Sequence, residues 1–194
     1  MNLTRIALIL LAAAAVSNCA APGPPGNVEN ACAILDDRPQ WGEALDRAAM
    51  RWGAPPHVAM AIIWKESSFK AEARTSRTYF LGVIPNGRRS SAYGFAQAID
   101  GTWDWYRKDT GNSRANREDF NDAADFVGWY MARSRTSAGI DMDDAFNQYL
   151  AYHEGHAGFN KQSWRAKPWL MRVAAEVKRK AAEYERQIAV CRRT

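Results

Sequence analysis

The chain has 194 residues, of which 47% are hydrophobic and 24% charged, and its formal net charge is +5 at pH 7. The hydrophobic content excludes a disordered chain, and the length suits one ordinary domain that can bury a sizeable core. The basic balance favours an anionic partner.

The N-terminus has the pattern of an export signal. Arg5 precedes an apolar run over residues 6–16, which is too short for a transmembrane helix because such a helix needs about 20 residues. We therefore expect a signal peptide over residues 1–18 and an exported protein. Because the chain also lacks a nucleic-acid recognition motif, we expect no nucleic acid, and cell wall or lipid headgroups become the expected anionic partners.

Residues 16–19 read Val-Ser-Asn-Cys and resemble the lipobox of bacterial lipoproteins, although Asn18 stands where a smaller residue is usual. Lipidation of Cys19 would place the protein in the periplasm, anchored to the outer membrane, which is the usual destination when no Asp follows the cysteine. The alternative is ordinary signal cleavage near Ala20 or Ala21.

The two remaining cysteines, Cys32 and Cys191, bracket the rest of the chain. An oxidising periplasm would allow them to form a disulfide, and the alternative is two free thiols. Residues 19–30 are rich in proline and glycine and lack apolar periodicity, so they predict a flexible linker. We expect residues 31–194 to form one domain.

The first part of this domain predicts two consecutive helices. Residues 39–52 carry apolar side chains at helical spacing, and Gly53 stands where that helix would end. Pro55 and Pro56 then open a second helix, because proline is tolerated in the first turn. The apolar run over residues 58–69 forms most of that helix.

The second helix ends in an acidic residue, Glu66. Ile62 and Ile63 precede it by four and three residues, so all three side chains share one face. The acid would therefore point in the direction of the core. The alternative is that Glu66 turns into water, as most glutamates do.

The rest of the domain predicts a short β element near residues 78–91, followed by further helices. Residues 79–84 have strand character and run into a turn at 85–87, which suggests a small hairpin. Helices are expected over residues 101–110, 120–133, 143–153 and 169–190, with Asn121 or Asp122 as the cap of the second. The predicted fold class is mainly α, an α+β lysozyme-like single domain.

Three short blocks resemble the motifs of one known family. Residues 66–69 read Glu-Ser-Ser-Phe, residues 92–97 read Ala-Tyr-Gly-Phe-Ala-Gln, and residues 151–155 read Ala-Tyr-His-Glu-Gly. In order and spacing they are similar to the motifs of the lytic transglycosylase domain of the soluble lytic transglycosylase type, which is related in fold to goose-type lysozyme. The chain departs from that pattern where Phe95 and Ala96 replace Leu and Met, and where His153 and Glu154 replace Asn and Ala.

The resemblance implies one catalytic carboxylate acting on peptidoglycan. Glu66 would protonate the oxygen between N-acetylmuramic acid and N-acetylglucosamine, and would then take the proton of the sugar's own C6 hydroxyl as a 1,6-anhydro end forms. Since the nucleophile belongs to the substrate, positioning replaces a second catalytic group. An apolar surround of the Ile62 and Ile63 kind would keep such an acid protonated near neutral pH.

The resemblance also implies a set of substrate-binding residues, in which Gln97 and the backbone near Gly94 and Phe95 would hold the sugar and Tyr152 would hydrogen-bond Glu66. The full set is Ser67, Ser68, Tyr93, Gly94, Phe95, Gln97, Tyr152 and His153. The alternatives are a core role for Tyr152 and a solvated position for Gln97.

Two features of the third block have competing interpretations. Glu154 is either a second carboxylate near the cleft or a solvated acid at a helix end. His153 and His156 are three residues apart, whereas a zinc protease motif needs two histidines four apart. We therefore expect no metal, and we expect no cofactor.

Two alternative functions stay open from the sequence: a hydrolytic muramidase on the same fold, and a non-catalytic lipoprotein that binds cell wall. Nothing in the sequence indicates an oligomer, so we expect a monomer. The basic face of the last helix either is solvated or helps to hold anionic peptidoglycan.

Overall fold

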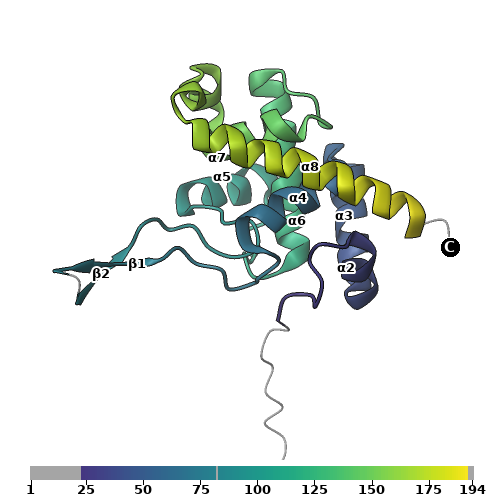
Figure 1. Ribbon diagram of the computed structural model, residues 1–194, viewed down its shortest axis with the longest axis horizontal. Coiled ribbons are helices and arrows are strands. Elements are labelled where there is room, and N and C mark those ends of the chain that lie inside the picture. Colours follow the sequence, from purple (N-terminus) through teal and green to yellow (C-terminus); the bar gives the residue numbers. More distant parts are fainter. Residues whose placement is uncertain (1–22, 82, 192–194) are drawn as a thin grey trace, which may run out of the picture.

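The computed structural model describes residues 23–81 and 83–191, so the predicted signal peptide and Cys19 lie outside the described residues. Within this part of the chain the fold is mainly helical, with one small antiparallel sheet (Figure 1). The predicted mainly α, lysozyme-like fold class is confirmed. None of the helices in the described residues combines the length and apolar character that a bilayer crossing requires.

The elements in chain order are α2 (Ala31–Asp37), α3 (Pro39–Trp52), α4 (Pro56–Ser67), β1 (Arg77–Phe80), β2 (Ile84–Arg88), α5 (Asp100–Thr110), α6 (Phe120–Ala138), α7 (Ala145–Asn160), the short 3-10 helix η2 (Ser163–Ala166) and α8 (Pro168–Cys191). α3, α4 and α8 match their predicted ranges within two residues. α6 and α7 run further than predicted.

Helix α4 is the centre of the core. Every residue from 58 to 63 is buried, which is the pattern of a helix covered on all sides. α8 lies across α4 and α7, while α3 packs against α6 (Figure 1). The core therefore encloses the helix that carries Glu66 at its end.

The ends of these helices follow local rules. Pro55 and Pro56 open α4, and Gly53 closes α3 with a left-handed φ of 73°. The cap of α6 is Asp119, so the prediction of Asn121 or Asp122 was wrong. The Asp119 side chain accepts hydrogen bonds from the two backbone N–H groups that follow the first helical residue, which only a residue before the helix can do.

The hairpin differs from its prediction in the position of its turn. Phe80 pairs with Ile84, so the chain reverses between them, and residues 85–87 belong to β2. Gly87 has a φ of 79°, and the register shifts between the Arg77 pair and the pair that follows it. The glycine thus serves a bulge in the strand, not the turn.

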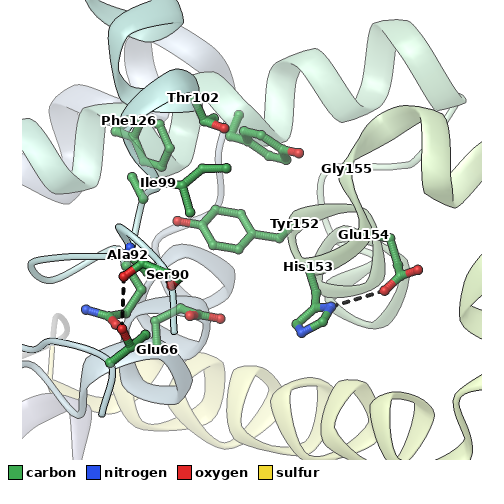
Figure 2. A pocket seen from close by; sticks show the side chains of 14 residues that line it. Glu66, Ser90, Ala92, Ile99, Thr102, Phe126, Tyr152, His153, Glu154 and Gly155 are labelled. Atoms are coloured by element: carbon green, nitrogen blue, oxygen red, sulfur yellow. Dashed lines mark hydrogen bonds and ion pairs between the residues drawn. The ribbon is translucent and has the colours of Figure 1, made fainter. Parts of the chain in front are cut away.

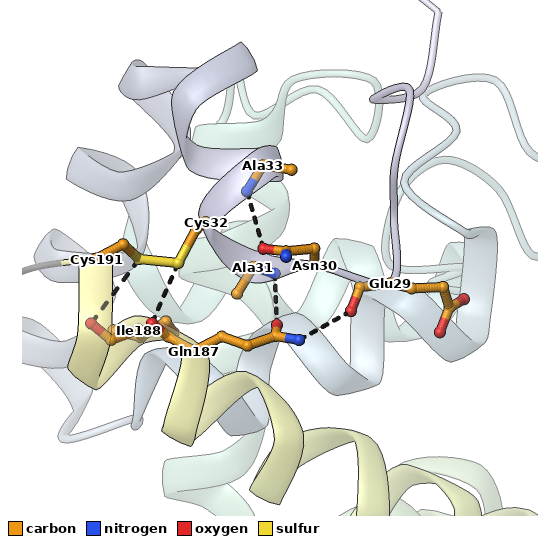
Figure 3. The surroundings of a disulfide bond; sticks show 8 residues. All are labelled: Glu29, Asn30, Ala31, Cys32, Ala33, Gln187, Ile188 and Cys191. Atoms are coloured by element: carbon orange, nitrogen blue, oxygen red, sulfur yellow. Dashed lines mark hydrogen bonds between the residues drawn. A yellow bond between two sulfur atoms is a disulfide. The ribbon is translucent and has the colours of Figure 1, made fainter.

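A disulfide joins Cys32 of α2 to Cys191 at the end of α8, with the two Cα atoms 5.8 Å apart (Figure 3). Beside it, the Gln187 side chain accepts from Ala31 N at 2.7 Å and donates to Glu29 O at 3.3 Å. The two ends of the described chain are therefore fastened together. In the chain-entropy model a bridge across so long a loop contributes about 5 kcal/mol to stability.

Candidate active site

A cleft of about 530 Å³ opens beside the end of α4. Glu66 comes from α4, Thr102 from α5, Phe126 and Tyr130 from α6, and Tyr152, His153, Glu154 and Gly155 from α7; the connecting segment supplies Thr75, Ser90, Ala92, Gln97, Ala98 and Ile99 (Figure 2). Each of the three sequence blocks thus contributes at least one residue to the cleft. Other residues of the blocks do not line it.

Glu66 lies in the last turn of α4, half-buried, with Ile62 and Ile63 fully buried one turn before it. Burial raises the pKa of the Glu66 carboxyl to about 7, against lowering by a hydrogen bond from Tyr149 and by the charge of Lys65. A carboxylic acid of this pKa can donate its proton and take it back near neutral pH.

Tyr149, not Tyr152, is the hydrogen-bond partner of Glu66. The Tyr152 hydroxyl instead donates to the backbone oxygen of Ala96 at 2.6 Å, so the expected bond from Tyr152 to Glu66 is corrected. Tyr149 lies one turn earlier on α7 and is buried. Tyr149 lies three residues before Tyr152, so helical spacing places the two side chains on one face of α7. No family motif marked Tyr149.

Gly94 and Phe95 are not among the residues that line the cleft. Gly94 N donates to Ala73 O at 3.0 Å and Phe95 N donates to Arg117 O at 3.2 Å, so both N–H groups are already used within the protein. A side chain at position 94 would place its Cβ 2.3 Å from Arg117 O. These two N–H groups therefore shape the loop, and the expected role of this backbone in holding the sugar stays a prediction.

The Phe95 ring lies in the core, 5.4 Å from the Trp41 ring and 5.3 Å from the Phe120 ring. Gln97 does line the cleft. Its Nε2 donates to Ala73 O and Gly94 O at 2.8 and 2.9 Å, which leaves its side-chain oxygen as the group to offer a ligand.

Tyr93, Ser67 and Ser68 are also not among the residues that line the cleft. The Tyr93 hydroxyl donates to Glu118, and the Arg74 guanidinium lies 3.8 Å from the centre of its ring. Ser67 is buried and bonds back to Ile63 O at 3.2 Å. Ser68 caps α4 in a left-handed conformation. The interactions that the structure gives these residues lie within the protein, and their expected contacts with substrate stay a prediction.

Glu154 lines the cleft edge, but its carboxylate is held by other groups. Lys167 Nζ lies 2.7 Å from one of its oxygens, and the Ser163 hydroxyl donates to the other. Although burial raises it, these bonds and one with His153 lower the pKa of Glu154 to about 2. Figure 2 shows Glu154 on the far side of His153 from Glu66.

A family model described as the transglycosylase SLT domain matches residues 7–191. The chain belongs to this family. The assignment gives the chain a transglycosylase-type function on peptidoglycan in general terms. No curated protein matches the chain.

The other residues that line the cleft of this SLT domain belong to none of the three sequence blocks. Phe126 and Tyr130 follow the helical apolar spacing of α6, which could equally have marked core residues. Ile99 is 48% exposed, and only the folded loop shows that it faces the cleft. Trp103 is buried and Trp105 is 42% exposed, and neither lines the cleft.

His156 of the SLT domain makes its contacts within the protein. His156 Nε2 lies 3.1 Å from the Ser134 hydroxyl, and its ring stacks on Tyr130 at 4.6 Å. Within residues 23–81 and 83–191 there is no group of three or more His, Cys, Asp or Glu side chains that could hold a metal ion.

Proposed function

We propose that the chain is a peptidoglycan lytic transglycosylase that cleaves the β-1,4 bond between N-acetylmuramic acid and N-acetylglucosamine. The observation that carries the proposal is the pKa of Glu66, which burial raises to about 7 at the wall of the cleft. An ordinary surface glutamate would be ionised at this pH and would have no proton to give.

In the first step Glu66 donates its proton to the glycosidic oxygen as the bond from that oxygen to C1 of the muramic acid breaks. Positive charge then develops on the sugar ring, and Glu66 is left as a carboxylate. The Tyr149 hydroxyl favours this charged form, because it donates a hydrogen bond to it. The same contact fixes the direction of the carboxyl group.

In the second step the Glu66 carboxylate accepts the proton of the C6 hydroxyl while O6 bonds to C1. The product carries a 1,6-anhydro ring, no water is consumed, and Glu66 is again protonated. The enzyme's task is to hold O6 near C1, which is a matter of positioning. Tyr152, Gln97 and Ile99 line the space in which the sugar would lie.

The surroundings of Glu154 support the lyase over a hydrolase. A hydrolytic muramidase of the usual kind needs a second carboxylate to activate water or to act as nucleophile. Glu154 is the other acid in the described cleft lining, and Lys167 and Ser163 hold its carboxylate. A carboxylate so engaged is poorly suited to either role.

We further propose that the protein is exported and attached to the periplasmic face of the outer membrane through Cys19. The support is the apolar run over residues 6–16 and the lipobox-like residues 16–19. Metabolic labelling with a fatty acid tests this proposal, because label should enter the wild-type chain and should be lost in Cys19→Ser.

Mass spectrometry of digested sacculi tests the function. The lyase releases muropeptides with anhydro ends, which are about 18 Da lighter than the reducing ends that a hydrolase makes, because one water is not added. We expect anhydro ends from the wild type and none from Glu66→Gln. Reducing ends alone would establish a hydrolase, and sacculus binding without release in both proteins would establish a non-catalytic binder.

A further inference from the structure

The β1–β2 hairpin projects away from the helical body (Figure 1). Three aliphatic residues, Leu81, Val83 and Ile84, lie at its end, and they are 78%, 75% and 54% exposed. We call them the aliphatic tip. Exposed apolar side chains scattered singly are ordinary, but three gathered on a projecting hairpin mark a contact surface.

The backbone at the tip departs from what a turn normally selects. Leu81 has a φ of 53°, in the left-handed region where turns place Gly or Asn at lower cost. No contact with the core requires leucine there, since the side chain is 78% exposed. A bulky apolar residue at a strained and exposed position points to a function outside the fold.

Basic residues lie behind the aliphatic tip. Arg77 of β1 is opposite Arg88 of β2 in the strand register, Arg89 follows directly, and all three are exposed. We call them the arginine collar. No acidic residue occurs between Arg74 and Ile99, so this segment carries positive charge without compensation. Among the described residues no ion pair involves the collar.

We propose that the hairpin is a membrane-contacting element, whose aliphatic tip enters the surface of a bilayer containing anionic phospholipid while the arginine collar binds the headgroups. Leu81 lies four residues beyond Arg77, or about 13 Å along a strand. A headgroup layer is about 5–8 Å thick, so collar arginines at its outer face would place the tip about 5–8 Å inside the hydrocarbon.

The chemistry of the aliphatic tip favours lipid over two rivals, a sugar and a protein. Sugars are held by aromatic faces and polar groups, whereas the aliphatic tip offers neither. A protein socket reads one face or one edge of a strand, but every residue of β2 is exposed. Val83 belongs to the turn and Ile84 is the first residue of β2, and both side chains are exposed, which suits a medium that surrounds the tip.

Contact with a membrane would also orient the cleft. Thr75 and Ser90 lie at the base of the hairpin, joined by a hydrogen bond from Thr75 Oγ1 to Ser90 O at 3.0 Å, and both line the cleft. The hairpin therefore links the bilayer surface directly to the cleft wall. This inference depends neither on the proposed reaction nor on lipidation of Cys19.

A fluorescent probe at the tip tests the proposal without reporting on the N-terminal region. The full chain carrying Cys19→Ser and Leu81→Cys is labelled with a polarity-sensitive dye, and Met50→Cys, on α3 and 80% exposed, is the matched control. With vesicles of three parts phosphatidylcholine to one part phosphatidylglycerol, we expect the emission at position 81 to shift to the blue and rise about twofold or more. The control should not change.

Replacing arginines of the collar with uncharged glutamine tests whether the collar binds anionic headgroups. Arg77→Gln with Arg89→Gln should weaken the response on anionic vesicles by about tenfold or more, and vesicles of phosphatidylcholine alone should give little response with either protein. The proposal is overturned if the emission at position 81 does not shift with anionic vesicles, if the response is unchanged after neutralisation, or if sacculi or a protein extract give the shift and vesicles do not.

Discussion

The Tyr149 hydroxyl donates a hydrogen bond to the Glu66 carboxyl group, from one turn before the tyrosine that the family motif contains. Two opposing effects meet at this carboxyl. Burial raises its pKa strongly, and the Tyr149 bond lowers it. Together these effects leave the pKa of Glu66 at about 7, so the group can both donate and accept a proton near neutral pH.

Removal of the Tyr149 hydroxyl should move the pH dependence of the reaction. In Tyr149→Phe the effect that lowers the pKa of Glu66 is lost, so that pKa should rise by about one unit. Since Glu66 must be protonated to begin, activity should fall above about pH 7 in the wild type, and this alkaline limb should move to higher pH in the variant. Rates of muropeptide release between pH 5 and 9 measure it.

Tyr130→Phe is the matched control for this experiment. Tyr130 also lines the cleft, but its hydroxyl donates to Ala151 O at 3.2 Å. Its loss should leave the alkaline limb in place. An equal shift in both variants would mean that Tyr149 acts through general packing and not through Glu66.

The raised pKa of the half-buried Glu66 should also make stability depend on pH. The pKa of Glu66 is raised from 4.5 to about 7 in the folded state, so folded protein binds more protons between these values and stability falls as pH rises through them. Glu66→Gln keeps the neutral form. The free energy of unfolding of this variant should equal that of the wild type below pH 4.5 and exceed it by about 3 kcal/mol above pH 7.

Urea unfolding of both proteins from pH 4 to pH 8 gives this difference. Glu43→Gln, on the surface of α3 with its side chain 73% exposed, controls for the loss of a carboxylate. A constant difference between wild type and Glu66→Gln across the range would show that Glu66 is not a perturbed acid.

Glu154 should stabilise the fold and leave the chemistry alone. Its carboxylate binds Lys167 and Ser163 across the break that Gly155 makes in α7. Glu154→Gln should cost about 1–2 kcal/mol at pH 7. Because the pKa of Glu154 is lowered to about 2, this cost should disappear as pH falls from 4.5 towards 2.

The pH profile of activity separates this role from a catalytic one. For Glu154→Gln the profile should have the same shape and midpoint as for the wild type. A displaced midpoint, or loss of activity in a folded variant, would return Glu154 to the role of a second catalytic carboxylate.

Gly94 should tolerate no side chain. Its φ is 80°, and an added Cβ would lie 2.3 Å from Arg117 O, so Gly94→Ala should lose more than about 2 kcal/mol or fail to fold. Gly101→Ala, in α5 with nothing within 4 Å of the added Cβ, should be neutral or slightly stabilising. Thermal unfolding compares the two, and similar melting temperatures would contradict the structure.

The helices and the position of Glu66 could be predicted because they depend on local signals. Pro55 and Pro56, Gly53 and the apolar run of α4 fix that helix without reference to the rest of the chain. The turn of the hairpin could not be placed, because Gly87 supplies the same positive φ to a bulge that it would supply to a turn.

The site was harder to predict because motif residues and contact residues are different sets. Gly94 and Phe95 resemble the family's sequence, yet their N–H groups are taken by Ala73 and Arg117, partners far along the chain. Tyr149 belongs to no motif, and only the packing of α7 beside α4 brings it to Glu66. Such long-range pairings have no local signal in a single sequence.

The titration of Glu66 tests the central claim most directly. Carbon-13 NMR of the glutamate side-chain carboxyl groups, with the Glu66 signal assigned by its absence in Glu66→Gln, follows this one group through pH. We predict a midpoint of about 7. A midpoint near 4.5, the ordinary value for glutamate, would contradict the assignment of Glu66 as the proton donor.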